Sequence, residues 1–227
     1  MRSFKVNHGS VNLENKVFRK LAQKADEFEA YANPHAERIA ILVTEIGRTF
    51  SLGSKDLQSL RGAALLHDFG EVNMGREYIK RGGPLTAEER IDLERHPIIG
   101  EQEAAKSGGD RATQLIVRWH HEWWNGTGYP DGLRRDEIPL AARILRVADS
   151  YAAITDNRPF RAAMNKDQAR EHMAEWAGIE FDPEIVEALL SLGPIGELES
   201  FATAEEKVNL QGNPPASREW QLFSSYS

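Results

Sequence analysis

The spacing of apolar residues along the chain predicts a protein built of helices. From residue 13 to residue 32, apolar side chains recur at nearly helical spacing among lysine, arginine and glutamate residues, which is typical of an amphipathic helix. The same periodicity returns in five later segments, namely residues 35–46, 57–68, 111–122, 140–155 and 183–190. No segment alternates apolar and polar residues as a half-buried strand does. We therefore expect an all-α fold.

Cap and turn residues separate these segments. An Asn-Pro pair at residues 33–34 interrupts the first pattern and can start the next helix, and an Asp-Pro pair at residues 182–183 caps the last. Residues 86–89, Thr-Ala-Glu-Glu, form a capping-box pattern that opens a further helix. The sequence therefore predicts short connections between consecutive helices.

Two stretches are expected to be loops, and the end of the chain is expected to be a tail. Residues 69–84 have the glycine and proline content of a loop. Residues 123–139 are richer still in these residues, and we expect an ordered functional loop there. Beyond residue 193 hydrophobicity falls. We divide the chain into an N-terminal helical extension (1–32), one helical domain (33–193) and an irregular C-terminal tail (194–227).

Composition narrows the classes of function. The 227 residues carry a formal net charge of −7, which argues against broad binding to DNA or RNA backbones. No apolar run approaches the roughly 20 residues that a membrane helix needs, and residues 1–5 lead into no signal-peptide core. We therefore expect a cytoplasmic protein that binds neither nucleic acid nor membrane. Because the chain has no cysteine, any metal must be held by histidine, aspartate or glutamate.

Histidine and aspartate residues near the ends of the predicted helices are candidate metal ligands. The seven candidates are His35, His67, Asp68, His96, His120, His121 and Asp149. Seven nitrogen and oxygen ligands suffice for two ions with positions left open for water and substrate. Taken singly, His35 and His96 equally fit helix caps, and the pair at residues 120–121 fits one core and one surface residue.

A series of motifs, taken in order, resembles the HD-GYP family. The matching motifs are His67-Asp68, His96-Pro97-Ile98-Ile99-Gly100, His120-His121-Glu122, the run from Asn125 to Leu133 with Gly128-Tyr129-Pro130, Ile138-Pro139, Arg143-Ile144, Val147-Ala148-Asp149, Arg158-Pro159-Phe160-Arg161 and Phe181-Asp182-Pro183. The resemblance covers residues 33–190. It implies one HD-superfamily helical domain with a two- or three-metal centre. It also implies hydrolysis of the bacterial second messenger cyclic di-GMP to linear pGpG, and in some members on to GMP.

The resemblance also assigns roles to individual residues. The seven candidates above match the family's metal ligands, with Asp68 in the bridging position, where a metal-bridging hydroxide attacks the phosphate. Tyr129 lies in the loop beside the substrate. Arg158 and Arg161 match positions that bind phosphate oxygens. The implied cofactors are two divalent ions, with iron or manganese favoured and zinc as the alternative.

Three positions differ from the family pattern. Tyr31 stands where three-metal members have a glutamate, and a phenol with a free pKa of about 10 is a poor ligand, so we expect two metals. Glu71 replaces the lysine of His-Asp-x-Gly-Lys, and it either repels a substrate phosphate or faces the metals as an added ligand. Two charges about 4 Å apart interact by roughly 4 kcal/mol at an effective dielectric of about 20. An interaction of this size would affect the reaction, so Glu71 is a catalytic candidate together with Asp68. Ala152 stands where many members have aspartate.

Three functions fit these residues. We favour a metal-dependent cyclic di-GMP phosphodiesterase of bacterial signalling. A second hypothesis keeps the metal centre and changes the substrate to pGpG, a mixed cyclic dinucleotide or another phosphoester. A third is a signalling module that binds cyclic di-GMP, or a GGDEF-domain protein to which the family's Gly-Tyr-Pro loop is linked, without useful turnover. The N-terminal helix fits a homodimer interface and fits packing within a monomer equally well.

Overall fold

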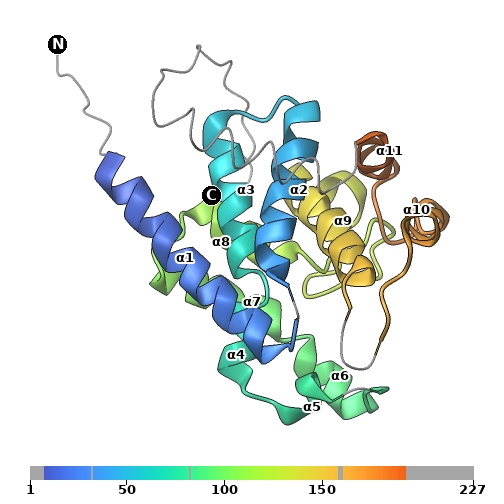
Figure 1. Cartoon of the computed structure of the whole chain (residues 1–227), viewed down its shortest axis with the longest axis horizontal. Helices are drawn as coiled ribbons and strands as arrows, with labels where there is room; N and C mark the ends of the chain where they lie inside the picture. Colours follow the sequence, from blue (N-terminus) through green and yellow to red (C-terminus); the bar gives the residue numbers. More distant parts are fainter. Residues whose placement is uncertain (1–7, 32, 82, 158–160, 193–227) are drawn as a thin grey trace.

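The computed structural model describes residues 8–31, 33–81, 83–157 and 161–192, with side chains from residue 16 onward (Figure 1). Within these ranges the chain forms eleven α-helices and one 3₁₀ helix. They are α1 (His8–Phe28), α2 (His35–Thr49), α3 (Ser54–Leu66), α4 (Phe69–Met74), α5 (Glu77–Lys80), α6 (Ala87–Leu93), α7 (His96–Lys106), α8 (Arg111–Trp119), η1 (Arg135–Glu137), α9 (Leu140–Thr155), α10 (Lys166–Glu175) and α11 (Pro183–Ser191).

The predicted all-α fold is confirmed for the described residues. No β-strand occurs among them, and an isolated bridge joins Ala177 to Phe181. The predicted capping box forms at the start of α6, where the Thr86 hydroxyl accepts the backbone N–H of Glu89 and the Glu89 carboxylate accepts the backbone N–H of Thr86. In the described part of the chain, no helix is both long and apolar enough to cross a membrane. The predicted C-terminal tail lies outside the described residues.

Helices α2, α3 and α9 form the centre of the molecule and lie side by side in Figure 1. Ile39 and Leu42 of α2, Leu60 of α3, and Ile144 and Leu145 of α9 are fully buried in one continuous core. Each buried leucine or isoleucine stabilises the fold by roughly 1.5–3 kcal/mol. This rigid core holds the helix ends that carry the candidate ligands.

Helix α1 packs along one side of this core, against α2, α3 and α4 (Figure 1). Its inner face follows helical spacing through Phe18, Ala22 and Ala25, which are all buried. A Cβ added to Gly62 of α3 would lie 3.2 Å from the Phe18 ring, so this glycine allows the close approach of α1. Helix α1 therefore buries its apolar face within this chain, while the division of the chain at residue 32 remains a prediction.

The structure corrects three details of the predicted elements. Residues 69–84 were expected to be a loop, but they contain α4 and α5. Helix α8 ends at Trp119 and not at Glu122, because the chain turns there into the loop that follows. Helix α10 was not predicted, although its buried Ala169 and Met173 have helical spacing and its capping box between Asn165 and Gln168 is a sequence signal.

The starts of α4 and α7 pack closely because Gly70 has no side chain. A Cβ added at Gly70 would lie 2.1 Å from the carbonyl oxygen of His96 and 2.9 Å from the backbone nitrogen of Gly100. Real Cβ atoms do not approach backbone atoms so closely, so one helix would have to move. This contact brings Asp68, which precedes α4, next to His96, which opens α7.

We expect Gly70→Ala to destabilise the protein by about 3 kcal/mol, because an overpacked backbone contact has no flexible side chain to relax. Urea unfolding followed by circular dichroism measures the change. Gly53→Ala is the matched control, since the nearest side-chain atom to an added Cβ is 3.5 Å away. Equal stability of the two variants would contradict the close packing of α4 on α7.

Candidate metal centre

Helix ends bring the candidate ligands together. His67 follows α3, His96 opens α7, and His120 follows α8. His35 opens α2, and Asp149 lies within α9. Because a helix end leaves backbone groups without intrahelical partners, side chains there can bond the last carbonyls of the same helix. The fold therefore delivers polar side chains to one buried place from helices far apart in sequence.

All seven predicted ligands lie in two groups, each small enough to hold one ion. In each group, one candidate ligand atom per residue lies within 4.8 Å of the others. The first group is Asp68, His96, His120 and His121, and the second is His35, His67 and Asp149. Nitrogen and carboxylate oxygen donors of this kind suit zinc, manganese and iron.

Asp68 connects the two groups. Its Oδ2 lies 2.9 Å from Nε2 of His67 in the second group. Its Oδ1 faces the first group, 3.4 Å from Nε2 of His96 and 3.5 Å from Nε2 of His120. Each carboxylate oxygen thus points to a different group, which is the arrangement a bridging carboxylate needs.

Hydrogen bonds orient three of the histidine rings. Nδ1 donates to the carbonyl oxygen three residues earlier, at 2.9 Å for His67, 2.8 Å for His96 and 2.6 Å for His120. A donating Nδ1–H leaves a lone pair on Nε2 of the neutral ring, ready to bind a metal. Nδ1 of His35 instead lies 3.0 Å from Oδ2 of Asp156. Helix geometry therefore sets the metal-facing nitrogen in these rings.

Charges around the second group favour protonated rings. Burial opposes the charged form, but the hydrogen bonds with Asp149 and Asp156 outweigh it and raise the pKa of His35 to about 9. Burial likewise opposes charge on His67, and the carboxylate of Asp68 more than compensates, raising its pKa to about 10. Nε2 of His35 faces Oδ1 of Asp149 at 3.4 Å, as Nε2 of His67 faces Oδ2 of Asp68. A cation would satisfy both atoms and replace the protons, so these residues fit a metal ion.

In the first group, the surroundings favour neutral rings. Burial lowers the pKa of His96 to about 4 and outweighs the attraction of Asp68. Burial, followed by the charges of His120 and Arg146, holds the pKa of His121 well below its usual range. Neutral imidazole is the form that coordinates metals.

Glu71 lies beside the centre, and the charges that act on it most strongly are those of other carboxylates. It is 8% exposed, and its Oε2 is buried without a hydrogen-bond partner. Burial holds its pKa well above the usual range, and the carboxylate of Glu29 adds the next contribution. Asp68 and Asp149 raise it further. Glu71 therefore lies close enough to both groups to be affected by their charges but belongs to neither, and its role at the centre stays a prediction.

Glu29 was missed by the sequence reasoning. It is 6% exposed at the end of the buried face of α1, and its charge also helps to raise the pKa of His67. A usable signal existed, since Glu29 continues the spacing of Ala22 and Ala25 on the apolar face. A charged residue at such a position needs an explanation.

The loop after α8 covers one side of the first group. The ring of Tyr129 stacks on His121, with centroids 4.8 Å apart and 23° between planes. Glu122 holds the loop, because its carboxylate accepts the backbone N–H groups of Asp131 at 2.7 Å and Gly132 at 3.1 Å. The predicted ordered loop is therefore confirmed, and Glu122, which was matched in a motif but given no role, is its anchor.

Of the two arginines predicted to bind phosphate, the structure describes one. Arg158 lies outside the described residues. Arg161 is exposed, and its guanidinium donates to the carbonyl oxygen of Ala153 near the end of α9. The structure thus brings seven ligands, Glu71 and Tyr129 together, and it leaves Arg161 at the surface beyond α9.

Arg146 is a second residue that the sequence reasoning missed. Its Nη1 lies 2.9 Å from Nδ1 of His121 and 3.6 Å from Oδ2 of Asp149, and its Nη2 pairs with Glu180. The signal was its position three residues before Asp149, which places both on one helix face. It brings a permanent positive charge to the metal centre.

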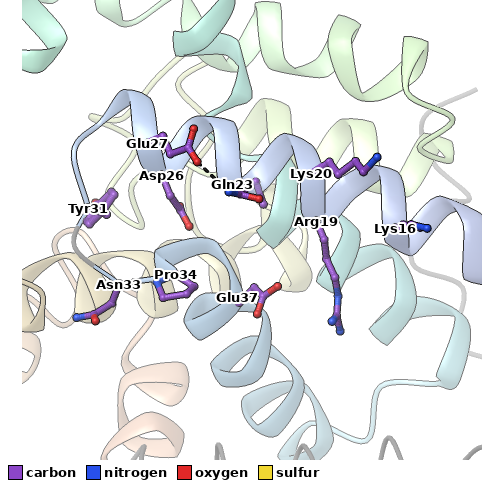
Figure 2. Close-up of a pocket in the computed structure, with 11 residues that line it drawn as sticks. Lys16, Arg19, Lys20, Gln23, Asp26, Glu27, Tyr31, Asn33, Pro34 and Glu37 are labelled. Atoms are coloured by element: carbon purple, nitrogen blue, oxygen red, sulfur yellow. Dashed lines mark hydrogen bonds between the residues drawn. The ribbon is translucent and has the colours of Figure 1, made fainter.

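A surface cavity of about 550 Å³ lies between α1 and the start of α2 (Figure 2). Figure 2 shows Lys16, Arg19 and Lys20 at one end of the cavity and Tyr31 at the other. The Tyr31 ring also stacks on His35, with centroids 3.8 Å apart and 7° between planes. Tyr31 therefore belongs both to the cavity wall and to the surroundings of the second group, where it packs against a candidate ligand.

Two curated relatives are phosphodiesterases of cyclic dinucleotides. The cyclic di-GMP phosphodiesterase response regulator RpfG of Xanthomonas campestris is 33% identical over 180 residues, which are 78% of this chain and 47% of the relative. The 3'3'-cGAMP-specific phosphodiesterase 3 of Vibrio cholerae is 35% identical over 164 residues, 72% of this chain and 36% of the relative. This chain therefore spans less than half the length of either protein.

Solved structures show the same fold. The cyclic GMP-AMP specific phosphodiesterase V-cGAP3 of V. cholerae superimposes with a TM-score of 0.64 at 20% identity, over 88% of this chain and 54% of that one. Bd1817, an HDG"Y"P protein of Bdellovibrio bacteriovorus, gives a TM-score of 0.59 at 21% identity, over 81% and 63%. At these identities the likeness concerns the fold alone.

A family model supplies the assignment. The model described as an HD domain matches residues 13–185, which is most of the chain and includes every one of the seven candidate ligands. This match confirms the predicted resemblance at the level of the HD domain. The chain belongs to the HD-domain family.

Proposed function

We propose that this chain is a metal-dependent phosphodiesterase that hydrolyses cyclic di-GMP to pGpG. One observation carries the proposal: the carboxylate of Asp68 directs one oxygen to each of two groups of metal-binding side chains. Two divalent ions at such a centre supply the activation of water and the charge neutralisation that phosphodiester hydrolysis needs. The names of the relatives support a cyclic dinucleotide as the substrate.

The proposed roles follow from placement. Asp68 bridges the two ions, and the other six ligands complete the two groups. Tyr129, which stacks on His121, forms a wall against which a base or ribose of the substrate lies. The roles of Arg158 and Arg161 in binding phosphate rest on the resemblance alone. Iron and manganese remain the favoured ions, with zinc as the alternative, because nitrogen and oxygen ligands suit all three.

A second candidate substrate is a mixed cyclic dinucleotide such as 3'3'-cGAMP. Glu71 favours this alternative, because a buried carboxylate replaces the positive charge expected beside the phosphate. Relatives of both specificities match this chain at similar identity, which leaves the choice between the two substrates to experiment.

The full chain, loaded anaerobically with Fe(II) or Mn(II), is expected to convert cyclic di-GMP to pGpG, measured by chromatography of the nucleotides. We expect Asp68→Asn to lower the rate by more than about 100-fold, because one bridging carboxylate serves both ions. Asp167→Asn, at an exposed position in the first turn of α10, is the control. Turnover of 3'3'-cGAMP alone would favour the second substrate, and stoichiometric metal without any product would contradict hydrolysis.

Metal binding is expected to release about two protons at pH 7, because His35 and His67 are protonated in the metal-free protein and must be neutral to coordinate. Their raised pKa values mean that apparent affinity rises as the pH goes from 7 towards 9. Titration calorimetry in buffers with different ionisation enthalpies measures the protons. Heats independent of the buffer would contradict the assignment of these histidines as ligands.

Glu71→Gln is expected to stabilise the metal-free protein at pH 8 by about 1–3 kcal/mol. The raised pKa means that folding opposes ionisation of Glu71. The resulting loss of stability is absent below the usual pKa and grows as the pH rises towards the pKa that Glu71 has in the folded protein. Urea unfolding at pH 4 and pH 8 tests the sign, with exposed Glu88→Gln as the control. An equal gain in the free energy of unfolding at both pH values would show that Glu71 is not held neutral by its neighbours.

A further inference from the structure

Arg146 touches one candidate ligand from each metal group. It lies on α9, and its side chain is 14% exposed. Nη1 contacts Nδ1 of His121 at 2.9 Å and lies 3.6 Å from Oδ2 of Asp149. Among the described residues, it is the arginine whose guanidinium bonds directly to a histidine of the centre. Its position therefore bears on how the centre takes up its ions.

The direction of the bond to His121 follows from chemistry. A guanidinium has donors only and stays protonated in proteins, so Nδ1 of His121 must accept. A neutral imidazole that accepts at Nδ1 carries its proton on Nε2. His96 and His120 in the same group have the reverse arrangement, because their Nδ1 atoms face carbonyl oxygens and must donate. His121 is thus set differently from the two rings beside it.

This arrangement blocks both nitrogens of His121. Nδ1 has its lone pair engaged by Arg146, and Nε2 carries a proton. Coordination through either nitrogen requires the hydrogen bond to break, either to free Nδ1 or to move the proton onto it. A divalent ion in the first group would also lie close to the guanidinium, and like charges repel.

The guanidinium has another partner when it leaves His121. Nη2 pairs with the carboxylate of Glu180, which also accepts from Oγ of Ser150 at 3.3 Å. The backbone oxygen of Glu180 accepts the N–H of Trp124 at 3.0 Å, so this acid is fixed to the loop that covers the centre. Arg146 can therefore give up His121 and remain bound.

We propose that Arg146 competes with a divalent ion for His121 and so weakens ion binding by the group of Asp68, His96, His120 and His121. The inference rests on the proposed metal centre, but its test measures metal binding and not turnover. An inactive protein in which Arg146→Met tightens the binding of one ion would support it. Arg146 is a positioning residue in this scheme, since it acts through His121.

The test compares this chain with its Arg146→Met variant by calorimetric titration of the metal-free proteins with Mn(II). Side chains that support a metal ligand usually strengthen binding, and their loss weakens it by about 10–100-fold. A competitor has the opposite sign, so we expect Arg146→Met to tighten one site by about tenfold and the other site by less. Arg90→Met, an exposed change of equal charge, is expected to alter neither site.

A double variant isolates the contact. In a His121→Ala background, Arg146→Met is expected to change metal affinity less than twofold, because the side chain for which Arg146 and the ion compete is absent. Weaker binding in Arg146→Met, or an equal effect in both backgrounds, would overturn the proposal.

Nitrogen chemical shifts of the histidine rings test the proposal without any substitution. We expect a protonated Nε2 on His121 and a protonated Nδ1 on His120 in the metal-free protein, and protonated Nδ1 on both rings would refute it.

Discussion

The burial of Asp68 among histidine side chains is the interaction on which the rest of the centre depends. A carboxylate removed from water needs opposite charge or donors close by. Asp68 finds them because His67 follows α3, His96 opens α7 and His120 follows α8, around the same point. His67 in turn holds the pKa of Asp68 well below its usual range, although burial alone would raise it. Without this cluster, three helix ends would bury polar groups at a cost to folding.

Sequence reasoning reached the fold class and all seven ligands because both depend on local patterns. Apolar spacing indicates helices, and the order of short motifs from His67 to Asp149 indicates one centre. It missed Glu29 and Arg146, because helical spacing marks both positions but their importance depends on which helix faces pack together. Helix α4 was missed for the same reason: its place against α7 depends on the absence of a side chain at Gly70, which local propensity cannot distinguish from a loop signal.

Charges in this centre are distributed in an unusual way. Glu71 places a buried carboxyl group on the α4 side, where the HD-GYP pattern predicts a positive charge, and the charge of Glu29 opposes its ionisation. Arg146 brings a positive charge to the α9 side, next to His121. The centre is therefore polarised from α9 towards α1 and α4. A phosphodiester, which is an anion, is expected to approach from the α9 side, where Tyr129 also stacks.

The ligands come from segments far apart in the sequence, and this has a consequence for the lifetime of the protein in a cell. An unfolded chain cannot hold these side chains close together, so bound ions stabilise only the folded state, by an amount set by free metal concentration. When metal is scarce, the buried acids and protonated rings lose the cations that would join them, and α2, α3, α7, α8 and α9 are held together less firmly. Metal starvation would then remove the protein through proteolysis as well as through lost activity.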